Sequence, residues 1–167
     1  IDFNEKFHPN KIDFYSLKSK KKICELDISS FDSKDSKYTT LKRSTLVKFL
    51  KKDLENLIKT SYKISKIIQQ NRQITLSFEN KETIECDYLI ISDGVFSKSK
   101  SLISNNKAQL KYNDTLAIRG IIPRSSKNND NKNISLYLGS DFHHVIYPVN
   151  PSGDLNFIAI IKYKLSN

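Results

Sequence analysis

Alternating apolar and polar residues predict β-strands in most of the chain. The alternation is clearest at residues 12–17 and 23–28, which flank a Lys-rich stretch and predict a hairpin. Residues 62–69, 72–79 and 83–91 predict three further strands. The third of them becomes fully apolar near its end, as a strand buried on both faces would.

The last third of the chain also reads as strand. Four segments there show strand patterns, and the strong turn sequence Asn150-Pro151-Ser152-Gly153-Asp154 separates the last two. A long polar stretch at residues 125–132 predicts a loop. We therefore expect an antiparallel meander, built from residues 115–122, 133–138, 142–149 and 155–163.

The clearest helix pattern runs from residue 38 to residue 59. Its apolar residues recur at spacings of three and four and predict one core-facing stripe, which includes Leu46, Leu50 and Leu54. The N-cap stays open between Thr39, Thr40 and Ser44.

Arg43 falls in or just before the first turn of this helix. A cation there opposes the helix dipole. Arg43 therefore either has an anionic partner or is simply exposed.

An abrupt change from apolar to polar residues follows the strand at 88–91. The sequence Ser92-Asp93-Gly94 comes directly after it, and residues 97–103 can form a short helix. A strand, a tight turn and a helix start bring backbone N–H groups and one carboxylate to the end of a sheet, where nucleotides bind. Read alone, Asp93-Gly94 is equally well explained as an ordinary turn.

Composition limits the class of protein. The chain has 167 residues, 38% of them hydrophobic, which suits one domain or pieces of two. No apolar run approaches the roughly 18 residues of a membrane span, and the N-terminus does not resemble a signal peptide. The sequence contains no Met, so we expect an excised fragment.

The chain is strongly basic, with a net charge of +10 and a pI of about 9.5. Such a charge invites a nucleic-acid interpretation. However, only four of the 28 basic residues are Arg, and the Lys are scattered along the chain. Proteins that recognise bases and phosphates favour Arg over Lys. We expect no nucleic-acid partner, and we keep as the alternative a non-enzymatic basic module that binds nucleic acid or an acidic partner.

Residues that commonly carry chemistry are few. Cys24 and Cys86 form no C-x-x-C motif, so we expect two buried, reduced thiols and a cytoplasmic protein. The three His have no metal-site spacing, and no metal is expected. His143 and His144 are neighbours on one strand, so only one of them can face a given pocket. The four Gly build no G-x-G-x-x-G or phosphate-binding loop, and no catalytic residue is marked.

Residues 87–100, D-Y-L-I-I-S-D-G-V-F-S-K-S-K, resemble a fingerprint of the class A FAD-dependent aromatic hydroxylases (para-hydroxybenzoate hydroxylase-like monooxygenases). That fingerprint reads roughly D-x-L-I-G-A-D-G-x-x-S-x-x-R. Ile91, Ser92 and Lys100 depart from it, and Lys100 keeps the charge of the usual Arg without its fork of donors. The matching positions are Asp87, Leu89, Ile90, Asp93, Gly94 and Ser97.

Two more segments resemble this family in the same order along the chain. Residues 43–50 are similar to its R-x-x-L-x-x-x-L helix, and Tyr147-Pro148-Val149 is similar to a segment of its substrate-domain sheet. Arg119-Gly120 stands where relatives often have a similar pair. The resemblance covers residues 10–162 and looks closest to the ubiquinone-biosynthesis and salicylate-type hydroxylases.

The resemblance implies an α/β fold, α+β within this stretch. It would comprise part of an FAD/NAD(P)-binding Rossmann-like domain plus an antiparallel substrate-domain sheet. We expect a hairpin at residues 1–38 that joins this sheet, part of the FAD domain at 39–108 and part of the sheet at 109–167. The Gly-rich loop of the flavin site would lie outside the 167 residues.

The implied activity is hydroxylation of a small aromatic, phenolic substrate by FAD, NAD(P)H and O2, with ubiquinone biosynthesis as a candidate pathway. The resemblance assigns FAD binding to Arg43, Asp93 and Gly94. It suggests Arg119, His144 and Tyr147 as the substrate-lining residues. The chain alone is expected to be inactive and to bind FAD poorly. Peripheral membrane contact stays open, while no transmembrane segment is expected.

Overall fold

The computed structural model describes residues 1–103, 111–124 and 132–165. It divides into two compact units. The first combines Ile1–Lys52 with Asn113–Asn167, and the second is Asp53–Tyr112. All but the last residue of the predicted loop at 125–132 lie outside the described residues.

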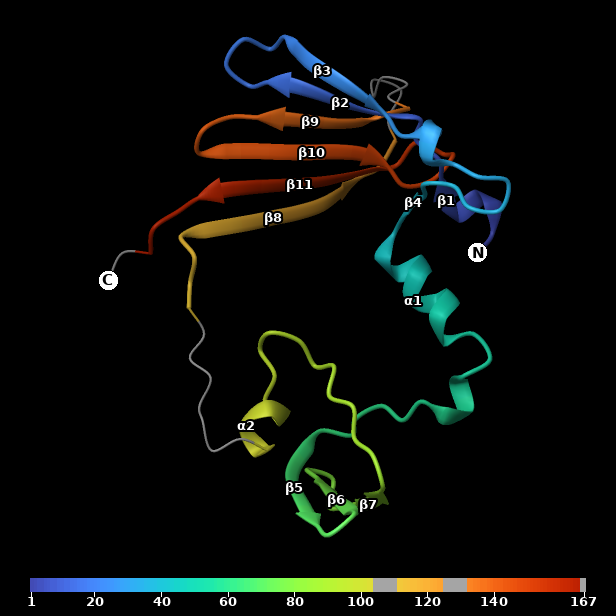
Figure 1. Cartoon of the computed structure of the whole chain (residues 1–167), viewed down its shortest axis with the longest axis vertical. Helices are drawn as coiled ribbons and strands as arrows, with labels where there is room; N and C mark the ends of the chain where they lie inside the picture. Colours follow the sequence, from blue (N-terminus) through green and yellow to red (C-terminus); the bar gives the residue numbers. More distant parts are fainter. Residues whose placement is uncertain (104–110, 125–131, 166–167) are drawn as a thin grey trace. The chain divides into compact units, whose positions relative to one another are not determined.

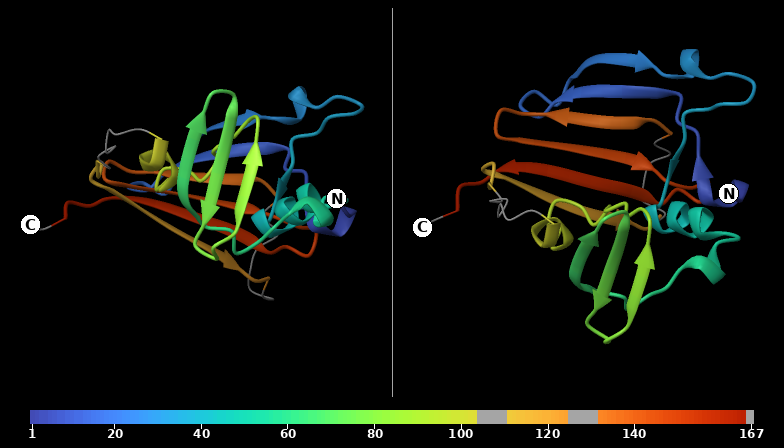
Figure 2. Two further views of the ribbon diagram at one scale, coloured as in Figure 1. Left: turned by 90° about the horizontal axis from the view of Figure 1, so that it is seen from below. Right: turned by 60° about the horizontal axis from the view of Figure 1, so that its bottom comes forward.

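A six-stranded sheet forms most of the first unit (Figure 1). Its strands lie side by side in the order β3-β2-β9-β10-β11-β8, which Figure 2 also shows. Short strands β1 (Lys6–Phe7) and β4 (Thr40–Leu41) form a separate pair, and short 3-10 helices occur at Phe3–Glu5 and Ser29–Phe31. The six strands are β2 (Lys11–Ser16), β3 (Lys22–Asp27), β8 (Thr115–Ile122), β9 (Ile134–Leu138), β10 (Phe142–Pro148) and β11 (Leu155–Lys162).

The strand pairing confirms the predicted hairpin and refines the predicted meander. Strands β2 and β3 pair antiparallel, and β2 also pairs parallel with β9. Strands β9, β10 and β11 follow one another in antiparallel order. Strand β8 lies beside β11 rather than β9, so it takes the far edge of the sheet.

Some of the best-buried side chains of the first unit belong to strands β10 and β11, the turn between them and the segment before β2. Val149 is 1% exposed and Ala159 2% exposed, and Pro148 and Pro9 are fully buried. The Val149 N–H donates to the Asp154 carbonyl at 2.9 Å. The backbone at this end of the sheet is therefore held by both packing and hydrogen bonds.

Helix α1 (Arg43–Lys51) is shorter than the helix predicted for residues 38–59. It starts late because Thr40 and Leu41 are extended and pair with β1. It ends early because the C-cap residue Lys52 is extended, with a ψ of 134°, and Asp53 has a φ of +63°; a 3-10 turn at Glu55–Leu57 follows. Its N-cap is Lys42, without a side-chain cap, so the expected capping by Thr39, Thr40 or Ser44 is wrong.

The predicted apolar stripe of this helix is not buried. Leu46 is 41% exposed and Leu50 60% exposed, and Thr45 is the one buried residue of α1. The stripe is therefore available to a neighbour rather than part of the core of the first unit.

The second unit contains a three-stranded antiparallel sheet, β5-β6-β7 (Figure 2). Leu76 and Phe78 of β6 are both 7% exposed and supply its core. The Tyr62 ring meets the Phe78 ring edge-on at 5.1 Å. The elements of this unit are β5 (Ile64–Gln70), β6 (Gln73–Phe78), β7 (Thr83–Cys86) and α2 (Ser99–Ile103).

The apolar segment at 88–91 corrects the sequence prediction of a buried strand. Strand β7 ends at Cys86, and Tyr88 and Ile90 are each 89% exposed. Strand β7 pairs only with β6, and within the described ranges no strand pairs with residues 88–91. An apolar run can form a buried strand only where neighbouring strands supply hydrogen bonds and cover both faces.

Both cysteines are unpaired, as expected for reduced thiols. Cys24 is exposed and Cys86 half-buried, however, so the prediction that both are buried is wrong. Among the described residues, no helix is long and apolar enough to cross a membrane.

Candidate functional site

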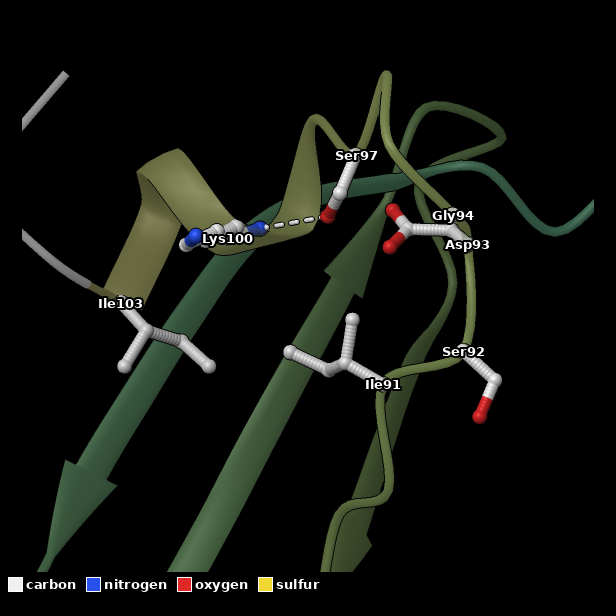
Figure 3. A pocket seen from close by; sticks show the side chains of 7 residues that line it. All are labelled: Ile91, Ser92, Asp93, Gly94, Ser97, Lys100 and Ile103. Carbon is white, nitrogen blue, oxygen red and sulfur yellow. Dashed lines mark hydrogen bonds between the residues drawn. The ribbon is translucent and has the colours of Figure 1, made fainter. Parts of the chain in front are cut away.

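The Asp93-Gly94 turn lies in the second unit, between the exposed segment 88–91 and helix α2 (Figure 3). Hydrogen bonds from three backbone N–H groups help to shape it. The Ser97 N–H donates to the Gly94 carbonyl at 3.1 Å, and the Ser99 N–H donates to Asp93 Oδ2 at 3.3 Å. The Lys100 N–H donates to Ser97 Oγ at 3.0 Å. The turn thus folds back on itself and leads directly into α2.

Two properties of the turn depend on its residue types. Gly94 has a φ of +81°, a conformation that side chains with a Cβ rarely adopt. A hydrogen bond from the Ser97 side chain lowers the pKa of Asp93, and bonds from Ser99 add to this effect. The carboxylate is therefore ionised at neutral pH and accepts hydrogen bonds.

A pocket of about 500 Å³ opens at this turn. Its polar lining residues are Asp93, Lys100 and two Ser, and the Ser92 hydroxyl points away from the other lining side chains (Figure 3). A Cβ added to Gly94 would meet nothing within 4 Å, so the space beside this residue is open. Such a site suits a ligand with several hydroxyl groups that approaches the backbone closely. The pocket is lined by Ile91, Ser92, Asp93, Gly94, Ser97, Lys100 and Ile103.

Arg43 lies in the first unit, as the first residue of α1. Its side chain is exposed and makes no ion pair or hydrogen bond with any described residue. The structure thus places Arg43 in one unit and Asp93-Gly94 in the other.

The three predicted substrate residues lie on the six-stranded sheet, but on two faces of it. Tyr147 and His144 are three residues apart on β10, so their side chains leave opposite faces. Arg119 pairs with Ile158 of β11, which pairs with Val145 of β10, and paired residues share a face of the sheet. Val145 and Tyr147 are two residues apart on β10, so Arg119 shares the face of Tyr147. His144 cannot line the same pocket as these two residues.

A cavity of about 420 Å³ lies on the face of Tyr147. Its walls are mostly apolar, with the hydroxyl-bearing side chains of Tyr38, Thr39, Thr40 and Tyr147. Burial raises the pKa of the Tyr147 hydroxyl, Tyr38 adds to the rise, and the Arg119 guanidinium opposes it. The cavity therefore combines apolar walls with two phenol side chains, and Arg119 is not among its lining residues. Its apolar walls are Ile12, Phe14, Leu41, Ile134, Leu136 and Val145.

Tyr38 is a cavity residue that the sequence did not reveal. It precedes β4 by two residues, in a stretch that the sequence predicted to begin the helix. The pairing of Thr40 and Leu41 with β1 brings this stretch to the sheet. The pairing with β1 leaves no pattern in the local sequence, so the sequence could not identify Tyr38 as a cavity residue.

His144 belongs to a row of rings on the opposite face. Its ring stacks on Tyr137 at 4.5 Å with an interplanar angle of 12°, and Tyr137 stacks on Tyr15 at 4.9 Å. Its Nδ1 is buried and has no hydrogen-bond partner among the described residues. Burial lowers the pKa of His144, so the imidazole is neutral at neutral pH.

No group of three or more His, Cys, Asp or Glu side chains in the described part of the chain is arranged to hold a metal ion.

No protein-family model and no curated protein matches this chain. Solved structures match it well. HpxO from Klebsiella pneumoniae, complexed with FAD and uric acid, gives a TM-score of 0.83 at 12% identity, over 99% of this chain and 43% of that one. The chain has part of the fold of an FAD-binding hydroxylase. The predicted fold class is thereby confirmed.

Two further structures support the same fold. The 2,6-dihydroxypyridine-3-hydroxylase from Arthrobacter nicotinovorans matches with a TM-score of 0.78 at 13% identity, over 99% of this chain and 43% of that one. A salicylate hydroxylase in complex with its substrate matches with a TM-score of 0.73 at 14% identity, over 98% and 43%. The chain thus spans less than half the length of each of these three structures.

Proposed function

We propose that this chain is part of an FAD-dependent monooxygenase that hydroxylates a small aromatic, phenolic substrate with NAD(P)H and O2. The observation that carries this proposal is the match of 99% of the chain to a structure complexed with FAD and uric acid. The fold of the neighbours and the residues of the fingerprint at 87–100 point to the same chemistry independently.

The residues at the Asp93-Gly94 turn fit a flavin cofactor. An ionised carboxylate accepts hydrogen bonds from sugar or ribityl hydroxyls, and the open space at Gly94 admits close approach to the backbone. Asp93 would hold FAD by hydrogen bonds rather than by charge attraction, since the pyrophosphate is itself anionic. When bound, FAD would take a hydride from NAD(P)H and activate O2 for transfer of one oxygen atom to the ring.

Arg43 would supply the cation of the flavin site. A guanidinium at a helix N-terminus is disfavoured by the helix dipole unless an anion lies nearby. Among the described residues Asp154 pairs with the N-cap residue Lys42 and no anion pairs with Arg43, so an anionic part of the cofactor would satisfy Arg43.

The cavity beside Tyr147 is the site that we propose for the aromatic substrate. Its volume of about 420 Å³ and its apolar walls suit a single small ring system. The Tyr147 hydroxyl and the Arg119 guanidinium would orient the polar groups of that ring. His144 lies on the other face and is not assigned to this site.

Three finer predictions rest on sequence reasoning and complete the proposal. Ubiquinone biosynthesis is the pathway suggested by the resemblance, and a cytoplasmic location is suggested by two unpaired thiols. The third is peripheral contact of the protein with a membrane surface.

The test uses the natural protein that contains these residues. We expect it to purify with flavin absorbance and to consume NAD(P)H faster when phenolic compounds are added. Asp93→Ala should weaken FAD binding about tenfold or more, because it removes an ionised hydrogen-bond acceptor. Glu79→Ala, which removes only a surface ion pair with Lys63, is the matched control.

Two results would contradict the proposal. One is a colourless protein that cannot be loaded with FAD. The other is salt-sensitive binding of nucleic acid without any flavin, which would favour the basic binding module instead. In addition, tight FAD binding by the 167 residues alone would contradict the expectation that part of the flavin site lies outside them.

A further inference from the structure

Helix α1 begins under unfavourable electrostatic conditions. The positive end of the helix dipole lies at its first turn, where an acidic residue or a side-chain cap is normally stabilising. Instead, the N-cap residue Lys42 and the first residue Arg43 are both cations, the first turn contains no acidic residue, and no side chain caps it. The helix therefore needs an anion from elsewhere in the fold to fix its start.

Asp154, from the turn between β10 and β11, supplies this anion. Its Oδ2 accepts from Lys42 Nζ at 2.7 Å. This ion pair joins residues 112 positions apart and is only partly exposed. The Lys42 carbonyl meanwhile accepts from the Leu46 N–H at 3.2 Å, so one residue both starts the helix and binds Asp154.

Asp154 is itself held firmly. Asn150 Nδ2 donates to Asp154 Oδ2 at 3.0 Å, and the Asp154 N–H donates to Asn150 Oδ1 at 3.0 Å. The Arg124 N–H donates to Asp154 Oδ1 at 3.3 Å. A hydrogen bond from Lys42 lowers the pKa of Asp154, with Asn150 adding to this effect, so the carboxylate is ionised at neutral pH. A rigid, charged anchor thus faces the start of α1.

A second contact fixes the same stretch of chain. The hydroxyl of Thr40 donates to the Pro148 carbonyl at 2.6 Å, and Thr40 is buried. Thr40 and Lys42 are therefore both tied to the β10–β11 end of the sheet. Arg43 follows directly, and its side chain makes no ion pair or hydrogen bond with any described residue, so its position depends on this attachment.

We propose that Asp154 is a positioning residue that, through Lys42, fixes the start of α1 and so directs the Arg43 guanidinium toward its anionic ligand. This inference rests on the proposed function, in which that ligand is FAD. Asp154 touches neither the cofactor nor the substrate in this scheme. Its loss would leave the sheet intact and allow the first turn of α1 to fray.

The test is a double-mutant cycle on FAD affinity in the natural protein that contains these residues. Asp154→Asn removes the charge and keeps a similar shape. If Arg43 is correctly placed in only about a fifth of molecules without this anchor, the dissociation constant of FAD rises about fivefold. Lys42→Gln breaks the same ion pair from the other side and should have the same effect.

The cycle separates positioning from a general loss of stability. If Asp154 acts through Arg43, Asp154→Asn adds nothing once Arg43→Ala has been made. Asp141→Asn is the control, because it breaks the Lys162 ion pair of 3.6 Å on the same sheet. This control should leave FAD affinity unchanged.

The outcomes distinguish this inference from the proposed function. Absence of bound flavin in the unmodified protein would contradict the proposed function. If flavin binds and Arg43→Ala weakens it, but Asp154→Asn and Lys42→Gln do not, the inference alone is wrong. Additive effects of Arg43→Ala and Asp154→Asn would also overturn it, and so would the absence of any effect of Arg43→Ala in a flavin-loaded protein.

Discussion

Gly94→Ala isolates the backbone requirement of the Asp93-Gly94 turn. Gly94 has a φ of +81°, and a Cβ there would meet no atom within 4 Å, so a methyl group causes no clash. The whole effect must come from backbone conformation. Placing an L-residue with a Cβ in the left-handed region costs about 1 to 2 kcal/mol.

This strain should appear as local opening of the turn. A loss of about 1 to 2 kcal/mol raises the population of the open turn about 5- to 30-fold. The Ser97, Ser99 and Lys100 N–H groups are donors in the turn, so their hydrogen exchange should accelerate by the same factor. Residue-resolved exchange measured by NMR would show it. The β6 amides should be unaffected, because they are bonded within their own sheet.

Gly120→Ala is the matched control for this substitution. Gly120 lies in β8, has no positive φ, and also leaves open space for a Cβ. Alanine should be neutral or slightly stabilising there, since it restricts the unfolded chain. The exchange rates of the turn in Gly94→Asn should lie between those of the unmodified protein and those of Gly94→Ala, because Asn tolerates positive φ. Equal exchange rates in Gly94→Ala and the unmodified protein would refute the reasoning.

Two further substitutions test the six-stranded sheet. Val149→Ala should destabilise the first unit by about 2 kcal/mol in urea unfolding, because Val149 is 1% exposed and its loss leaves a cavity, whereas Val95→Ala, at 75% exposure, should change little. His144→Phe should stabilise the same unit by about 1 kcal/mol, since it keeps the ring contacts and removes a buried Nδ1 without a partner. Burial lowers the pKa of His144 in the native state. The unmodified protein therefore loses stability as the pH falls through the unfolded-state pKa of about 6.5. The gain in stability from His144→Phe, measured by thermal unfolding, should be larger at pH 5 than at pH 8. No gain at pH 5 would contradict this account.

The strands were largely predictable because their information is local. Alternation at residues 12–17 and 23–28 gave β2 and β3 almost at their observed bounds, and residues 115–122 gave β8 at its observed bounds. The alternation that predicts β2 and β3 has a period of two and needs only neighbouring residues to be read. The order of the strands was less accessible. Parallel pairing of β2 with β9 joins segments more than 100 residues apart, and no local pattern encodes it.

The candidate sites were predictable in part for the same reason. The Asp93-Gly94 turn could be read from the sequence because a fingerprint surrounds it. The opposite faces of His144 and Tyr147 follow from their spacing on one strand, but the face of Arg119 could not be read, since it depends on pairing through β11. Arg43 was correctly expected in or just before the first turn of the helix, but the predicted start at residue 38 was wrong because Thr40 and Leu41 pair with β1. The Lys42–Asp154 ion pair left no signal in either segment.

The exposed segment at 88–91 joins the fold to the proposed function. Its apolar sequence predicts burial on both faces, yet Tyr88 and Ile90 are each 89% exposed, and the chain spans 43% of the HpxO structure. Burying two such side chains is worth roughly 1.5 to 3 kcal/mol each, so any strand that paired with this segment would gain substantially. Such pairing would also fix the Asp93-Gly94 turn at a strand end, where a flavin would meet it. Hydrogen exchange of the Tyr88–Ile91 amides should therefore be fast in the 167 residues alone and slow in a flavin-loaded natural protein. Fast exchange of these amides in both samples would show that segment 88–91 stays unpaired when flavin is bound, and would contradict this account of the turn.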